Sequence, residues 1–76
     1  MSRYYFDLRD SEGLSVDEEG LELRDWSAAQ DEAARSLADM ARDAARHFTG
    51  EIKQQVAIEV RDDIGPVMHV RLSFEV

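Results

Sequence analysis

Between residues 25 and 48, apolar and charged residues alternate with the period of an α-helix. At about 100° per residue, the apolar side chains fall on one arc and the charged side chains on the opposite arc. The apolar arc consists of Trp26, Ala29, Ala33, Leu37, Met40, Ala41, Ala44 and Phe48. The charged arc consists of Asp31, Glu32, Arg35, Asp39, Arg42, Asp43 and Arg46. Because a wide apolar stripe has to be buried, the pattern predicts one amphipathic helix that packs on the rest of the chain.

The ends and the polar side of this helix can also be predicted. Asp25 is a good N-cap, whereas Ser27 with Gln30 fits a capping box, so the helix begins at one of these two sites. Gly50 is the expected end. Oppositely charged residues four positions apart on the polar side predict weak ion pairs. These pairs are Asp31 with Arg35 and Arg35 with Asp39.

Before the helix, the alternation has the period of a β-strand. Residues 3–9 predict a half-buried strand, and residues 10–13 have the composition of a turn. Residues 14–17 can return as a short antiparallel strand. Gly20 breaks the chain again, and residues 21–23 form either a third short strand or a loop. The inward side chains of the first strand are Tyr4, Phe6 and Leu8.

After the helix, two more alternating segments are joined by a short loop. Residues 55–61 predict a strand, residues 62–65 a hairpin loop, and Pro66 follows where it need not donate to the ladder. The inward side chains are Val56, Ile58 and Val60, then Met68, Val70, Leu72, Phe74 and Val76. The predicted order is β-β-(β)-α-β-β. We expect an α+β fold, a two-layer sandwich in which one long helix packs on a small, mainly antiparallel sheet.

Length and composition limit the size of the core. We expect residues 1–76 to form a single domain, and 43% hydrophobic with 34% charged residues is typical of a globular protein. So small a core gives modest stability, which burial in a subunit interface would increase. Because twofold dimers are the commonest oligomers, we expect a homodimer.

The charge of the chain is strongly acidic. Seventeen acidic and nine basic residues give a formal net charge of −8. Phosphate backbones and anionic membranes repel such a chain, so we expect neither nucleic acid nor a membrane as a partner. The absence of cysteine excludes disulfides, thiolate metal sites and thiol catalysis. The first residues lack the apolar core of a signal peptide, and we expect a cytoplasmic protein without a cofactor.

Several short motifs spread over nearly the whole chain resemble one family. They are RYYFDLRD at 3–10, DEEG at 17–20, EL at 22–23, EA at 32–33 with Arg35, ARD at 41–43, IEVRD at 58–62 and VRLSF at 70–74. Together they resemble a family of short bacterial proteins that is known as a domain of unknown function. The resemblance implies a cytoplasmic, one-domain α+β protein and brings no activity, cofactor or catalytic residue. The layout of a hairpin followed by one helix is also similar to the N-terminal module of HicB-type antitoxins, without the DNA-binding segment of many such proteins.

The polar residues give little support to catalysis. The acidic residues before the helix lack the glycine and glutamate offsets of a calcium loop, so solvated turns account for them as well. They are Asp7, Asp10, Glu12, Asp17, Glu18 and Glu19. His47 and His69 have no second ligand at zinc spacing. His69 and Ser73 share a strand face but lie roughly 13 Å apart, too far for a nucleophile and its base. We therefore expect no enzyme.

One face of the sheet is predicted to remain uncovered by the helix. The candidate partner-binding residues on it are Tyr5, Arg9, Glu59, Arg61, His69 and Arg71. Arginines and an aromatic residue on a sheet face can bind single-stranded RNA, but acidic residues share this face. Ion pairs between neighbouring strands are the simpler interpretation.

These observations leave three functional hypotheses. The first is a non-enzymatic binding or regulatory module that acts through protein–protein contacts on the uncovered sheet face. The second is an antitoxin-like inhibitor of a small basic protein, which the negative charge of the chain would attract. The third is an enzyme of an unrecognised kind.

Overall fold

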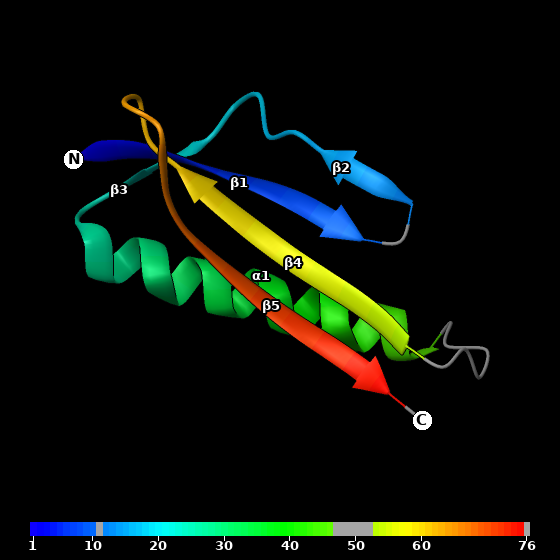
Figure 1. Cartoon of the computed structure of the whole chain (residues 1–76). Helices are drawn as coiled ribbons and strands as arrows, with labels where there is room; N and C mark the ends of the chain where they lie inside the picture. The colour runs from blue at the N-terminus through cyan, green and yellow to red at the C-terminus, as the bar shows by residue number, and fades with distance from the viewer. Residues whose placement is uncertain (11, 47–52, 76) are drawn as a thin grey trace.

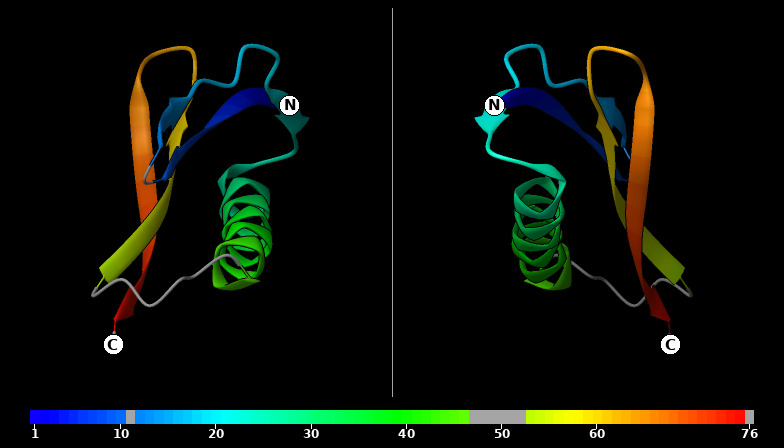
Figure 2. Two further views of the ribbon diagram at one scale, coloured as in Figure 1. Left: turned by 90° about the vertical axis from the view of Figure 1, so that its right-hand side faces the viewer. Right: turned by 90° about the vertical axis from the view of Figure 1, so that its left-hand side faces the viewer.

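The protein has one helix on one face of an antiparallel sheet. The structure is a computed structural model that describes residues 1–10, 12–46 and 53–75. Its elements, in chain order, are β1 (Ser2–Asp10), β2 (Gly13–Ser15), β3 (Leu21–Leu23), α1 (Trp26–Arg46), β4 (Lys53–Arg61) and β5 (Pro66–Glu75). Figures 1 and 2 show the two layers, with α1 behind the sheet in the first view. The predicted α+β class is confirmed, and residues 21–23 form a strand.

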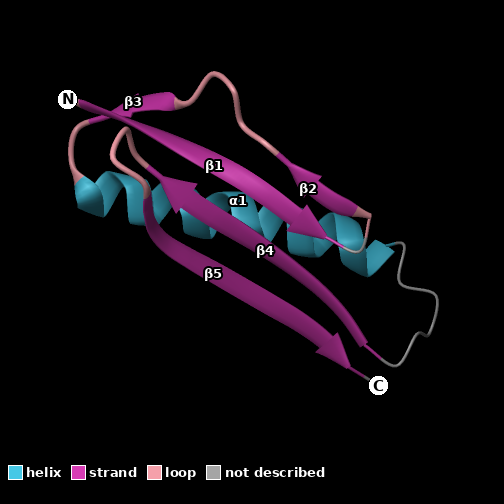
Figure 3. Cartoon of the chain, turned by 45° about the horizontal axis from the view of Figure 1, so that its top comes forward, coloured by secondary structure: helices cyan, strands magenta, loops and turns pink. Residues whose placement is uncertain are grey.

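The strands follow the order β2-β1-β4-β5, and β3 also pairs with β1. The two short strands use opposite ends of β1, because β2 pairs with Leu8–Asp10 and β3 with Ser2–Tyr4. Between them the chain of residues 16–20 leaves the ladder and bends away from the sheet (Figure 3). The longest ladder joins β4 to β5, from Lys53 opposite Glu75 to Arg61 opposite Pro66, with a register shift after Val60.

The core lies between α1 and the centre of the sheet. Ala29 and Ala33 of the helix are completely buried against aromatic and branched side chains. The small alanine side chains allow the helix to approach the sheet closely, and the large side chains of β1 and β4 fill the space. These core residues are Tyr4, Phe6, Ile58 and Val60, with Leu37, Met40, Met68 and Val70 packed around them. The predicted inward faces of β1 and β4 are therefore confirmed.

The helix begins where the first alternative placed it. Asp25 is the N-cap, because its Oδ1 accepts a hydrogen bond of 2.9 Å from the N–H of Ala28. The predicted i,i+4 ion pairs are wrong in their partners: Arg35 pairs with Glu32 at 2.9 Å, three residues away. The i,i+3 neighbour is as close on a helix as the i,i+4 neighbour, so the sequence does not distinguish between them. No described helix is long and apolar enough to cross a membrane.

Two predicted core residues are more exposed than their pattern indicates. Leu72 is 38% exposed, because β5 is the outermost strand and has a neighbouring strand on one side alone in the described sheet. Trp26 is 40% exposed in the first helical turn, where its ring contacts the ring of Tyr4 at 6.5 Å between centroids. The predictions for His47, Phe48, Gly50 and Val76, and for the side chain of Phe74, lie outside the described residues.

Candidate partner-binding face

The side of the sheet opposite α1 carries the side chains that the helix does not cover. We call this surface the open face. Directly opposed residues of antiparallel strands point to the same side, so the register assigns its members. Leu14 of β2, Arg9 of β1, Ala57 of β4 and Arg71 of β5 form one continuous row across four strands. The neighbouring rows place Asp7 beside Glu59 and His69, and Tyr5 beside Arg61.

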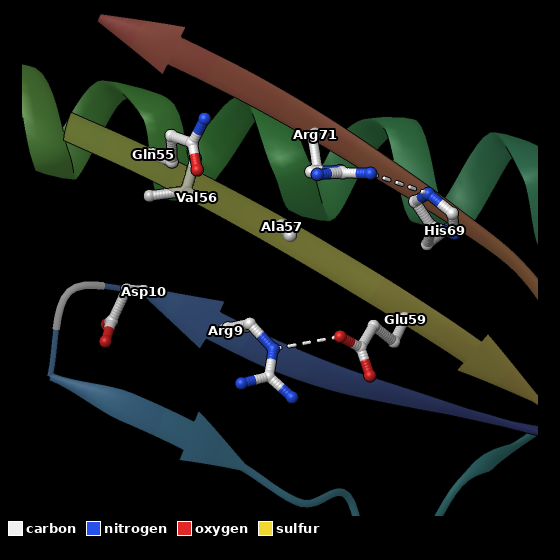
Figure 4. Close-up of a pocket in the computed structure, with 8 residues that line it drawn as sticks. All are labelled: Arg9, Asp10, Gln55, Val56, Ala57, Glu59, His69 and Arg71. Carbon is white, nitrogen blue, oxygen red and sulfur yellow. Dashed lines mark hydrogen bonds and ion pairs between the residues drawn. The ribbon is translucent and has the colours of Figure 1, made fainter. Parts of the chain in front are cut away.

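A pocket of about 470 Å³ lies on the open face above Ala57. The methyl group of Ala57 leaves space between the longer side chains of the neighbouring strands, and Figure 4 shows Arg9 and Arg71 on its two sides. Its lining residues are Arg9, Asp10, Gln55, Val56, Ala57, Glu59, His69 and Arg71. Four of the six predicted partner-binding residues are thus brought together. Ala57 was not among the predicted residues, although a small residue on the outward side of a strand, between longer ones, is a sequence signal for a hollow on the sheet face.

The charged groups of this pocket make weak contacts at the surface. Arg9 Nε donates to Glu59 Oε2 at 2.9 Å, and the two side chains are 52% and 44% exposed. This contact confirms the predicted cross-strand ion pairs, which contribute little in water. The guanidinium of Arg71 lies 3.3 Å from His69 Nε2 and forms no ion pair with a carboxylate among the described residues. Arg71 is therefore a cation available to a ligand.

The other two predicted residues, Tyr5 and Arg61, belong to a different arrangement. Arg61 Nε donates to Asp7 Oδ2 at 2.9 Å, and Arg61 Nη2 donates to the carbonyl oxygen of Asp17 at 2.8 Å. Asp7 Oδ1 accepts the N–H of Asp17 at 2.9 Å. We call Asp7, Asp17 and Arg61 the loop clamp. The guanidinium also stacks 4.4 Å above the Tyr5 ring, so this end of the open face holds the chain between β2 and β3 in place.

The carboxylate of Asp17 binds the backbone of β1 at the gap between β2 and β3. It accepts hydrogen bonds from the N–H groups of Phe6, Glu19 and Gly20 at 3.0–3.1 Å. Burial by itself would raise the pKa of Asp17, but these backbone donors and the charge of Arg61 together hold the pKa below its ordinary value. The N–H of Phe6, which faces the interruption between β2 and β3, thereby has a hydrogen-bond partner.

Gly20 is required at the end of the same loop. Its φ is +71°, and a Cβ atom there would lie 2.9 Å from the backbone oxygen of Tyr4. The prediction that the acidic residues are merely solvated turns is therefore wrong for Asp7 and Asp17. Asp7 is 7% exposed, and its carboxylate accepts from the Asp17 N–H and from Arg61 Nε. The Asp17 carboxylate accepts from three backbone N–H groups. Within the described ranges, no three His, Cys, Asp or Glu residues are placed to hold a metal ion.

His69 and Ser73, the two residues considered as a base and a nucleophile, are hydrogen-bonded to other partners. The described hydrogen bond of the Ser73 hydroxyl is to the Gln55 amide at 3.3 Å, and the His69 ring contacts Arg71. Arg3 lies at the far end of the sheet, where it binds the carbonyl oxygen of Glu19 and the carboxylate of Glu22. The cations on the open face are thus divided among the pocket, the loop clamp and the contacts of Arg3.

Comparison with known proteins places the chain in a family. A family model described as Domain of unknown function (DUF6894) matches residues 3–73, and the chain belongs to that family. No curated protein and no solved structure matches the chain. The likeness of layout to the HicB-type module remains a prediction.

Proposed function

We propose that this member of the DUF6894 family is a non-enzymatic, cytoplasmic module that binds a protein partner at the pocket above Ala57. The observation that carries the proposal is the position of Arg71, a cation without a described carboxylate partner at the wall of a pocket on an otherwise acidic chain. The volume of about 470 Å³ is enough for one or two partner side chains. Pockets of this size hold ligands in many proteins.

The pocket combines an apolar floor with polar walls. Ala57 forms the floor, and Leu14, which is 45% exposed, adds a second apolar side chain on the far side of Arg9. Arginine beside apolar surface is typical of protein interfaces, because its planar guanidinium group binds carboxylates and its aliphatic chain packs on apolar side chains. A partner segment with an apolar side chain next to an acidic one fits this arrangement. The net negative charge acts at longer range and is screened beyond about 8 Å at physiological salt.

The non-enzymatic part of the proposal is supported by the contacts of the titratable groups on this face. His69 is next to the positive charge of Arg71, and the described partner of Ser73 is an amide, not a base. A general base would have to lie within hydrogen-bond reach of the group that it deprotonates. These side chains are better placed to bind polar groups than to transfer protons.

The test is a quantitative affinity capture with two variants that change charge equally. Arg71→Glu alters the wall of the pocket, whereas Arg42→Glu alters an exposed arginine of α1, 66% accessible, away from the open face. We expect a partner that the wild-type protein and Arg42→Glu retain and that Arg71→Glu loses. Equal capture by all three proteins would refute the proposal. Capture of a basic protein that survives Arg71→Glu would favour the antitoxin-like alternative.

A further inference from the structure

The two edges of the sheet differ in how well they are protected against pairing with a strand of another chain. At one edge, β2 and β3 have three residues each. Between them, the Asp17 carboxylate binds the Phe6 N–H of β1, and the loop clamp fixes the connecting chain. Short, interrupted edge strands are a common means of preventing another chain from pairing with a sheet. This edge is therefore closed to strand addition.

The opposite edge is formed by β5, which has the properties of an open edge. The strand runs over ten residues, Pro66–Glu75, and pairs on one side with β4. Its other side has no strand neighbour in the described sheet. The register shift lies at its beginning, beside Pro66, and its remaining length has neither a proline nor a lysine to prevent pairing.

We propose that a second copy of this chain docks on the free edge of β5, with the two β5 strands antiparallel about a twofold axis. Such an axis, perpendicular to the sheet, places like faces together, so both α1 helices lie on one side and both open faces on the other. The partly exposed Leu72 lies on the helix side at this edge, where the second copy covers it. The result is one continuous sheet in which the apolar helix sides of the two copies adjoin, and so do their polar open faces.

The charge distribution also favours a second copy at this edge. The chain carries a net charge of −8, but residues 66–73 contain Arg71 and His69 and no acidic residue, so the two strands meet without acidic repulsion. An axis through Arg71 would oppose two guanidinium groups. An axis through Val70 avoids this contact: it pairs Arg71 with His69 of the second copy and Leu72 with Met68 of the second copy.

Sedimentation equilibrium at micromolar concentration in physiological salt tests the proposal. We expect the wild-type protein at twice the chain mass of 8.7 kDa. Leu72→Lys should weaken the dimer by at least ~10-fold, because it places a charge in the apolar seam. Leu14→Lys is the matched control, since Leu14 is similarly exposed but lies on β2 at the closed edge, and it should leave the dimer intact.

A second variant keeps the test decisive if Leu72→Lys does not fold. The chain has no cysteine, so Val70→Cys gives a single reactive site. Opposed residues of antiparallel strands have Cα atoms about 4.5–5.5 Å apart, which is within disulfide range, so oxidation should cross-link Val70→Cys and not Leu14→Cys.

A monomeric wild-type protein overturns the proposal. So does a dimer that survives Leu72→Lys, or one in which Val70→Cys fails to cross-link. Arg71 lines the pocket above Ala57 and also lies at the proposed seam, so capture is compared with Ala57→Leu, which changes the pocket from β4 and leaves the β5 edge unchanged. Loss of capture in Ala57→Leu supports binding at the pocket whether or not the dimer forms.

Discussion

Removing the charge of Asp7 is the sharpest test of the loop clamp. In Asp7→Asn, the amide keeps one acceptor oxygen but presents N–H groups at the other position. The oxygen can accept from Asp17 N–H or from Arg61 Nε, which now lie 2.9 Å from the two different carboxylate oxygens, and it cannot satisfy both. The substitution therefore removes one hydrogen bond at a residue that is 7% exposed and is otherwise isosteric.

The expected cost follows from the type of bond that is lost. Hydrogen bonds to charged groups contribute roughly 1.5–3 kcal/mol each, and the free side chain of Arg61 can turn partly toward water, since it is 34% exposed in the native contact. We expect Asp7→Asn to lower the free energy of unfolding by about 2 kcal/mol, which corresponds to a fall of about 1–2 M in the urea midpoint of a small domain.

Asp10→Asn is the matched control for this measurement. Asp10 is exposed, and its Oδ1 accepts the N–H of Glu12 at 2.8 Å, a bond that an amide oxygen also makes. We expect a change of less than about 0.5 kcal/mol, measured by urea unfolding with circular dichroism and Trp26 fluorescence. Equal midpoints for Asp7→Asn and Asp10→Asn would show that the loop clamp does not stabilise the fold.

Three further predictions concern the acidic loop, the helix and the pocket. The folded state lowers the pKa of Asp17, so the contribution of this carboxylate to stability is fully present above its ordinary pKa of 3.8 and is lost as the pH falls through its pKa in the folded protein. Urea midpoints measured during acidification should therefore fall more steeply for the wild-type protein than for Asp17→Asn. Leu37→Asp places a carboxylate against the core and should lower the free energy of unfolding by at least about 2 kcal/mol. Asp39→Ala, in an exposed pair with Arg42, should change it by less than about 0.5 kcal/mol. Equal urea midpoints for the two variants would contradict the assignment of the helix faces. Ala57→Leu fills the pocket from its floor and should leave the circular dichroism spectrum unchanged while abolishing capture of the partner; capture at the wild-type level would place the partner elsewhere.

The faces of the strands and the helix could be predicted because they depend on local periodicity. The alternation in residues 3–9 and 55–61 placed Tyr4, Phe6, Ile58 and Val60 correctly in the core. Asp25 was one of the two predicted starts of the helix, and the structure selects it. Burial at the outer strand was less predictable. Leu72 fits the inward pattern of β5, but its exposure depends on the place of β5 at the edge of the sheet, which the sequence of the strand does not encode.

The loop clamp could not be predicted, because its three residues are far apart in the chain. Asp7 is 10 residues from Asp17 and 54 from Arg61, and each of them has a local sequence typical of an exposed charge. Only the β1–β4 register and the return of the chain after β2 bring them together. Pairing Arg61 with Asp7 also has a consequence for the candidate site. It fixes one end of the open face, so the surface that remains available for a partner is the end where Arg9 and Arg71 border Ala57.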